Sequence, residues 1–376
     1  MTRLAKARRG AGEIVVLSSR RAFEALVGPV PDSARARHVF LKPARGARVD
    51  DVLFGARLVV SQSYLRPEIN RWIFQARRRA VPTLLLVDGP LEWANMHSNP
   101  SLARPGAEGA RALYDPIVHD AVAAIGRGQA LALARRNAGR GIVFTTYANR
   151  RIRTERLATE TGEAPRFDFL LTTARTAAFD APEREALRAA LCACASALER
   201  AGHATLVRIF DEPIREAVRA AAPHAQIDAS GSFTAALAQA RCVIGTPSSV
   251  LLEAMHHDRP TATLVFRDGP LFDRTGWLLG GFARWEASFA SMLARDPERM
   301  AIQRDALESS LSDRDYFTAI EALCAGETLT APRPFDALDL AFEHHVRRAA
   351  DPLRARLVAP IYRALRRFRR ERDPRD

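Results

Sequence analysis

Short apolar runs alternate along this chain with longer segments of helical periodicity. The runs are mostly continuous rather than alternating with polar residues, which is typical of strands buried on both faces of a parallel sheet. A first series of predicted strands covers residues 14–18, 38–41, 57–61, 83–87 and 141–146. A second series covers residues 167–173, 204–209, 226–228, 242–245 and 261–265. Because helical segments separate the strands, we expect right-handed βαβ units.

A polar stretch, residues 148–166, separates the two series and is the predicted linker. The pattern therefore predicts an α/β fold with two Rossmann-like lobes and a C-terminal helical tail. The predicted boundaries are a disordered N-terminus at 1–12, an N-terminal lobe at 13–160, a C-terminal lobe at 161–315, and C-terminal helices with a basic amphipathic tail at 316–376. We expect a terminal helix to pack back across the first lobe. The apolar segment around His119, DPIVHDAVAAIG, is predicted to be a helix.

Composition narrows the class of protein. A chain of 376 residues with 47% hydrophobic content can bury a large core, and its length favours two domains. The apolar runs are shorter than the roughly 18 residues of a membrane span, and the run at 14–17 is too short for a signal peptide. We therefore expect a cytoplasmic protein. The four cysteines have neither a disulfide pattern nor a zinc spacing, which predicts small hydrophobic core residues.

The net charge of +13 is unevenly distributed. Residues 345–376 hold 11 arginines and only 4 acidic residues, and the sequence contains no nucleic-acid-binding motif, so we expect no nucleic-acid partner. Within this tail, residues 354–372 repeat apolar side chains at helical spacing between arginines. Such a segment either lies on an anionic membrane surface or packs on the first lobe with a solvated arginine face.

The segment 241–265 predicts a ligand site, because a strand leads through Thr246 and Pro247 into a helix. A helix start offers unpaired N–H groups and a partial positive charge, which suit a phosphate. Ser248 and Ser249 add hydroxyl groups there, and Glu253 is positioned to accept from ribose hydroxyls. The alternative is that either serine only caps the helix, with Glu253 completing a capping pattern.

Two loops are expected beside that segment. Ser230 lies in the loop before the predicted helix at 233–240, where it either contacts a nucleotide or caps that helix. Arg208 and Asp211 flank the end of the strand at 204–209. The arginine suits a phosphate and the aspartate suits acid–base chemistry, whereas a plain salt bridge is the alternative.

The segment 84–95 predicts the reactive part of the site. Asp88 ends a buried strand, Gly89 permits close backbone approach, and Glu92 follows four residues after Asp88. A carboxylate at a strand end can act as a general base or as a nucleophile, although a turn-forming Asp-Gly is the alternative. Trp93, Asn95 and His97 are candidates to bind an acceptor sugar. No metal site is expected.

With these residues, the chain resembles GT-B glycosyltransferases that build bacterial surface polysaccharides. The Asp88-Gly89 pair is similar to the acidic motif of bacterial sialyltransferases and capsule-type Kdo transferases, in which that aspartate is a base or nucleophile. The pair Ser248-Ser249 is similar to the serines that hold the CMP phosphate in those enzymes, and to a pair in CDP-glycerol glycerophosphotransferases. Glu253, with Pro260, resembles the nucleotide-binding helix of many GT-B enzymes. Residues 210–213 (Phe-Asp-Glu-Pro) depart from the sialyltransferase pattern, which has a His-Pro pair there.

The resemblance implies a metal-independent glycosyltransferase that moves Kdo or a related acid from a CMP-sugar, its only co-substrate, onto a lipopolysaccharide or capsule glycan. Asp88 would be the catalytic carboxylate, assisted by Glu92 or Asp211. Ser248, Ser249 and Arg208 would hold the donor phosphate. Three alternatives stay open: a nucleotide-sugar 2-epimerase, a CDP-glycerol-type glycerophosphotransferase and a non-catalytic scaffold at a membrane surface.

Overall fold

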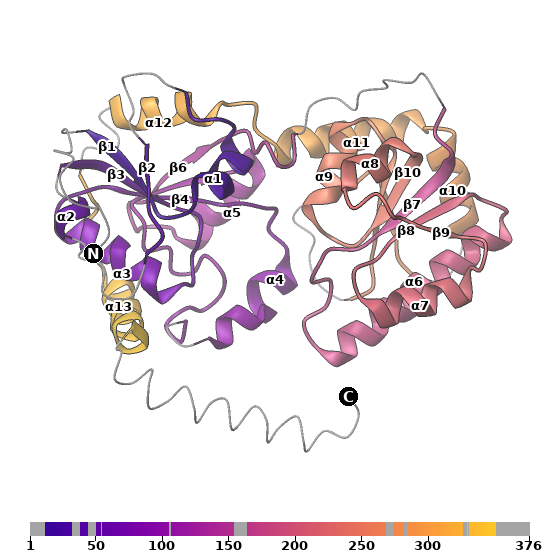
Figure 1. Cartoon of the computed structure of the whole chain (residues 1–376), viewed down its shortest axis with the longest axis horizontal. Coiled ribbons are helices and arrows are strands. Elements are labelled where there is room, and N and C mark those ends of the chain that lie inside the picture. Colours follow the sequence, from indigo (N-terminus) through magenta and orange to yellow (C-terminus); the bar gives the residue numbers. More distant parts are fainter. Residues whose placement is uncertain are drawn as a thin grey trace, which may run out of the picture.

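The protein forms two α/β lobes side by side, each built around its own parallel sheet (Figure 1). The structure is a computed structural model. It describes residues 12–31, 38–43, 50–53, 55–104, 107–153, 164–267, 274–281, 285–325, 329 and 331–350. The expected disordered N-terminus, apart from residue 12, and the basic tail at 354–372 lie outside the described residues, as do residues 154–163 of the expected linker.

The N-terminal sheet has six parallel strands in the order β2-β1-β3-β4-β5-β6. These strands are β1 (Glu13–Val16), β2 (His38–Phe40), β3 (Ala56–Ser61), β4 (Thr83–Leu86), β5 (Ala121–Ala124) and β6 (Val143–Thr146). The intervening helices are α1 (Arg20–Val27), α2 (Asp50–Leu53), α3 (Pro67–Arg78), α4 (Trp93–Ser98), a 3-10 helix (Pro100–Ala103) and α5 (Arg127–Arg136). Strands β3, β4 and β5 are buried over most of their length, which explains their continuous apolar sequences.

The C-terminal sheet is also parallel, in the order β12-β11-β10-β7-β8-β9. Its strands are β7 (Phe167–Thr172), β8 (Thr205–Arg208), β9 (Gln226–Ile227), β10 (Ala240–Gly245), β11 (Thr261–Leu264) and β12 (Trp277–Leu279). Its helices are α6 (Ala181–Arg200), α7 (Glu212–Ala221), α8 (Phe233–Ala238), α9 (Ser249–His256), α10 (Trp285–Leu293) and α11 (Pro297–Ser310). The order reverses between β7 and β10, so a crevice forms at the carboxyl ends of these two central strands.

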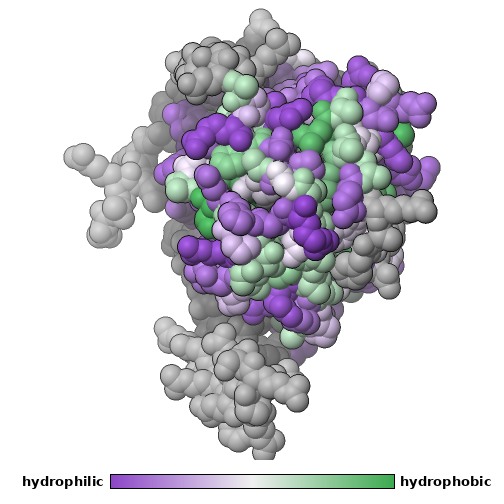
Figure 2. Space-filling model, turned by 90° about the vertical axis from the view of Figure 1, so that its right-hand side faces the viewer, coloured by the Kyte–Doolittle hydropathy of each residue, from purple (hydrophilic) through white to green (hydrophobic). Residues whose placement is uncertain are grey.

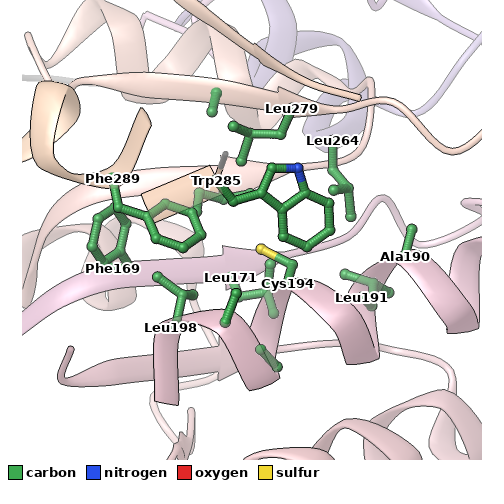
Figure 3. Packing of buried hydrophobic residues seen from close by; sticks show 14 of the residues in the cluster. Phe169, Leu171, Ala190, Leu191, Cys194, Leu198, Leu264, Leu279, Trp285 and Phe289 are labelled. Carbon is green, nitrogen blue, oxygen red and sulfur yellow. The ribbon is translucent and has the colours of Figure 1, made fainter. Parts of the chain in front are cut away.

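Each lobe has an apolar core beside its sheet. Figure 3 shows the core of the C-terminal lobe, where side chains of α6 and α10 meet those of β7. Cys194 points into this core among leucine and aromatic side chains, and burial raises the pKa of its thiol to about 12. Cys194 and Cys242 are fully buried and Cys192 and Cys324 half-buried, in keeping with their predicted packing role. On the outer face of this lobe, hydrophilic side chains interleave with smaller apolar areas (Figure 2).

The last two helices that the structure describes return to the N-terminal lobe, as the pattern predicts. Helix α12 (Tyr316–Ala325) buries Tyr316 against Phe23 of α1, with ring centroids 5.2 Å apart. Helix α13 (Ala337–Ala350) packs along α3 and adds Phe342 to the core of that lobe (Figure 1).

One prediction of local structure is wrong, and one strand was missed. The segment after His119 forms strand β5, not a helix; its alanines have high helix propensity, but they fit between β4 and β6 where both faces of the sheet are covered. His119 lies just before this strand, fully buried, with Nε2 2.9 Å from the Ser61 hydroxyl. Strand β12 was not predicted, because its apolar run is only three residues long.

Candidate functional site

A cavity of about 500 Å³ lies between the two lobes. Its N-terminal wall is the turn after β4, residues 89–92, together with Asn95 of α4 and residues in and beside the 3-10 helix, among them Arg104. Its C-terminal wall is formed by the loop after β7, the start of α9 and the segment that follows β11. The cavity therefore lies at the carboxyl ends of strands from both sheets, where open α/β folds bind their ligands.

The start of α9 forms part of the cavity wall. Gly245, the last residue of β10, allows β7 and α9 to pack closely here, because a Cβ would lie 3.0 Å from side-chain carbons of Thr172 and Leu251. Ser248 precedes the helix in an extended conformation but makes no capping hydrogen bond, and its Oγ is buried without a hydrogen-bond partner. A buried hydroxyl without a partner is unfavourable, so this hydroxyl has a hydrogen bond still to give.

The structure does not show a capping box formed by Ser248 and Glu253. In a capping box the glutamate is the third residue of the helix, but Glu253 is the fifth residue of α9. Its carboxylate is buried and accepts a hydrogen bond from Thr234 Oγ1 at 3.0 Å. Side chains do cap other helix starts: Ser19, Glu92, Asp180, Asp211, Ser232 and Asp296 begin α1, α4, α6, α7, α8 and α11.

The turn after β4 is held by three side chains from neighbouring elements. Tyr147 donates to the Val87 carbonyl at 2.9 Å and Asn149 to the Asp88 carbonyl at 3.1 Å. Gln129 of α5 donates to the Gly89 carbonyl at 2.6 Å. Three successive carbonyl groups are thus fixed, so the backbone that carries Asp88 is rigidly placed.

Asp88 lies one residue outside the cavity wall, which begins at Gly89. Solvent reaches its side chain, yet protein surrounds it closely enough that desolvation raises the pKa of its carboxyl group. The nearby charge of Arg151 opposes that shift but does not cancel it. A carboxylate with a raised pKa is a stronger base, which is the property that a general base needs.

The two carboxylates predicted to assist Asp88 both cap helices. Glu92 accepts from the backbone N–H groups of Ala94 and Asn95, at 3.2 and 2.7 Å. Asp211 caps α7 and lies 2.8 Å from Arg184, outside the cavity lining. Either role in acid–base chemistry stays a prediction.

The structure separates the three predicted acceptor residues. Asn95 lines the cavity, where its Oδ1 accepts from Asn99. Trp93 and His97 lie outside the lining, one helical turn apart, with ring centroids separated by 4.3 Å. Arg136 lies over the Trp93 ring at 5.5 Å and hydrogen-bonds to His97, and desolvation and this arginine together lower the pKa of His97.

The remaining predicted donor residues surround the end of β8. Arg208 lies between the rings of Phe210 and Phe233, at 4.7 and 5.7 Å, and 3.4 Å from a carboxylate oxygen of Asp228. Desolvation, helped by the charge of Arg175, lowers the pKa of Arg208, and the charges of Asp228 and Glu253 only partly oppose that shift. Ser230 is exposed in the following loop and donates to the Ser232 carbonyl. Arg208, Glu253 and the start of α9 therefore share one edge of the sheet, and Ser230 lies at its periphery.

Sequence reasoning missed the arginines of the cavity, which are Arg104, Arg267 and Arg274. Arg267 lies 2.8 Å from Glu92 of the other lobe and 2.9 Å from Glu183. Arg267 follows β11 by three residues, at the carboxyl edge of the sheet, and this position could have indicated it from the sequence.

Among the residues that the structure describes, no group of three or more His, Cys, Asp or Glu side chains is arranged to hold a metal ion. In the same part of the chain every helix is too short or too polar to cross a membrane.

Comparison with known proteins identifies the fold. No protein-family model and no curated protein matches the chain. Among solved structures, the S. aureus MnaA–UDP complex is 12% identical with a TM-score of 0.51, over 87% of this chain and 100% of that one. The UDP-GlcNAc 2-epimerase from Neisseria meningitidis bound to UDP-GlcNAc is 10% identical with a TM-score of 0.49, over 84% and 100%.

TarM is 11% identical with a TM-score of 0.46, over 72% of this chain. The chain spans about half of the length of TarM, 54%. The similarity to MnaA, together with the two six-stranded parallel sheets, shows that the chain has the two-lobed GT-B fold that the sequence predicts.

Proposed function

We propose that the protein is a glycosyltransferase that uses a nucleotide-activated sugar, bound in the cavity between its lobes. One observation carries the proposal: the start of α9 opens on this cavity without a side-chain cap, and the buried Ser248 hydroxyl has no partner there. An uncapped helix start with an adjacent hydroxyl is a ready site for a phosphate. Ser248 and Ser249 bind the donor phosphate, and Glu253 accepts from the ribose.

The proposed donor is a CMP-sugar of Kdo or a related acidic sugar. Three arginines line the cavity and Glu92 is the one acidic side chain among its described lining residues, which favours a ligand with negative charge beyond a single phosphate. Arg208 adds positive charge beside Glu253, and Ser230 closes the outer edge of the donor site. The partial positive charge of α9 stabilises the phosphate as it leaves, so the proposed reaction is metal-independent.

Asp88 is the proposed general base, which removes the proton of the acceptor hydroxyl as the glycosidic bond forms. Its raised pKa and the rigid turn that carries it support this role. Glu92 or Asp211 is the proposed assisting carboxylate, and each also caps a helix, α4 and α7.

The proposed acceptor is a lipopolysaccharide or capsule glycan at the inner face of the cytoplasmic membrane. Asn95 contacts its reacting end, and the stacked Trp93, His97 and Arg136 offer an outer surface for the preceding sugar. Residues 354–372 bring the enzyme to the anionic lipid surface on which such acceptors are carried.

The test is a thermal-shift titration of the full chain with CMP, CDP, UDP and GDP. We expect CMP to raise the melting temperature most, because a ligand at about 100 times its Kd stabilises the native state by about 2.7 kcal/mol. The same titration of Ser248→Ala should show a much smaller rise, whereas Ser309→Ala, on the exposed end of α11, should behave as wild type. If none of the four nucleotides raises the melting temperature, the proposal is wrong.

Product analysis then separates the alternatives. A transferase consumes CMP-sugar only when an acceptor glycan is present, with release of CMP. A 2-epimerase would interconvert the sugar nucleotide without acceptor, and a glycerophosphotransferase would consume CDP-glycerol instead. Either of these results would replace the proposed reaction while keeping the proposed binding site.

A further inference from the structure

Arg267 forms an ion pair between the two lobes at the wall of the cavity. One terminal nitrogen of its guanidinium lies 2.8 Å from Glu92 in the N-terminal lobe, and the other 2.9 Å from Glu183 in the C-terminal lobe. The rings of Phe179 and Phe266 lie within 5.3 Å of the guanidinium carbon. All three charged side chains are less than one-fifth exposed, so water screens these pairs less than pairs at the surface.

Both glutamates also organise the start of a helix. Glu92 caps α4 through the N–H groups of Ala94 and Asn95, and Asn95 itself lines the cavity. Glu183 lies in the first turn of α6 and accepts from the Phe179 N–H at 2.9 Å. Arg267 therefore ties the helix that presents the acceptor wall to the loop that forms the donor wall.

A second region joins the lobes in a different way. The Ser312 N–H donates to the Ile125 carbonyl at 2.7 Å, and the Ala148 N–H donates to the Arg314 carbonyl at 2.6 Å. Gly126 packs so tightly against the end of α11 that a Cβ would lie 2.2 Å from the Ser310 carbonyl oxygen. This junction combines the backbone hydrogen bonds with side-chain ones, among them Arg153 to the Ser312 carbonyl at 2.9 Å. Several bonds must break for it to open, whereas Arg267 can release Glu92 by a change of rotamer.

We propose that Arg267 is a positioning residue that works as a releasable clasp between the lobes. When it pairs with Glu92, α4 and the turn that carries Asp88 lie at a fixed distance from the start of α9. When the pair separates, the lobes move apart about the backbone junction at Ile125 and Ser312. The consequence of the clasp for transfer rests on the proposed function, but the clasp itself exists without any ligand.

The two glutamates offer a matched pair of variants. Glu92→Gln keeps an amide oxygen to cap α4 and removes the charge that holds Arg267 across the lobes. Glu183→Gln also replaces a carboxylate partner of Arg267 by an amide, but the contact that it changes lies within the C-terminal lobe. A clasp predicts different effects of the two variants on the separation of the lobes, whereas a purely local role predicts the same effect.

The experiment measures the distance between spin labels on the ligand-free full chain by pulsed electron resonance. The labels replace the exposed Leu131 of α5 and Leu278 of β12, with Cys192 and Cys324 changed to serine. We expect Glu92→Gln and Arg267→Gln to shift or broaden the distance distribution by more than about 2 Å, and Glu183→Gln to leave its mean unchanged. A Glu92→Gln distribution that superimposes on that of the unsubstituted parent would overturn the proposal.

Kinetics provide the second readout. In Arg267→Lys, which keeps the charge but loses the two-pronged geometry, we expect kcat to fall by about tenfold with a smaller change in donor KM, because misplaced reacting groups slow the chemical step. If no nucleotide binds, the proposed function is wrong, but the distance between the spin labels still tests the clasp. Wild-type kcat and an unchanged distance in the Arg267 variants would disprove the clasp while the proposed function stands.

Discussion

The amino ends of β4 and β5 and the carboxyl end of β10 both carry buried polar side chains, but they use them in opposite ways. At the amino ends, Arg77 pairs with Asp120 at 3.0 Å and with Asp339 at 3.1 Å, and Arg333 pairs with Asp339 at 2.8 Å. Arg140 joins the same network through Asp339. At the carboxyl end, the Ser248 hydroxyl is buried without a partner and α9 begins without a side-chain cap.

The side chains at the amino ends are paired and stabilise the fold, whereas the proposed role of Ser248 at the carboxyl end is to bind a ligand. With Asp336, which lies 2.7 Å from Arg140, three arginines and three aspartates pair with one another at the amino ends. They fix the chain leading into α13 against the sheet. Such a network is costly to break, since a buried charge would lose its partner. On the proposed function, the Ser248 hydroxyl gains a partner when the donor binds, so a substitution there should affect binding more than stability.

The largest effect is expected at Asp88. Asp88→Asn removes the proposed base and should lower kcat by a factor on the order of 10² to 10⁴, with nucleotide binding retained. Because desolvation by the surrounding protein raises the pKa of Asp88, the wild-type rate should fall as the pH drops through that raised value, where the carboxylate becomes protonated. Steady-state rates across pH, with thermal shift as the binding control, test this; full activity of the variant would remove Asp88 from the mechanism.

The second effect concerns the satisfied network. Asp339→Ala leaves Arg77, Arg140 and Arg333 each short of one partner and should lower the free energy of unfolding by about 3–5 kcal/mol. Urea denaturation provides the measurement. As a control, Asp258→Ala removes an exposed partner of Arg295 and should cost no more than about 1 kcal/mol. If the two variants lose the same free energy of unfolding, the buried network contributes no more than an exposed ion pair.

A smaller effect distinguishes two serines that both precede helices. Ser232 Oγ accepts from the Ala235 N–H at 3.1 Å, so Ser232→Ala should destabilise the ligand-free protein by about 1 kcal/mol. Ser248 makes no such bond, so Ser248→Ala should change the ligand-free stability by less than about 0.5 kcal/mol. Chemical denaturation of both variants compares them, and a loss of about 1 kcal/mol in Ser248→Ala would restore the simple capping role.

The smallest effect is a pH dependence of the contact between α13 and α3. Desolvation alone would raise the pKa of Glu343, but hydrogen bonds from Arg78 and Arg347 outweigh it, and the net shift is downward. A carboxyl group with a lowered folded-state pKa contributes stability above its unfolded pKa and loses it as the pH falls through the folded value. Hydrogen exchange of α13 should therefore accelerate in mild acid, and Glu343→Gln should remove most of that pH dependence. A wild-type profile that is flat in this range would count against the assignment.

The sequence predicted much of this fold because strands covered on both faces carry continuous apolar runs. It misread the segment after His119, where the alanines favour a helix locally and only the neighbouring strands β4 and β6 impose a strand. It also identified Ser248 and Glu253 without choosing between capping and binding, since that choice depends on whether one hydroxyl reaches one N–H group. The Arg267–Glu92 pair joins residues far apart in sequence, so no local pattern could indicate it.

The most direct measurement is a calorimetric titration of the wild-type chain and Ser248→Ala with CMP. If the start of α9 binds the donor phosphate, the wild type should bind one CMP and Ser248→Ala should bind it about tenfold more weakly, as expected from one lost hydrogen bond to a charged group. Ser309→Ala should match the wild type. Equal affinities for the wild type and Ser248→Ala, or no binding heat with either protein, would contradict a donor site at the start of α9.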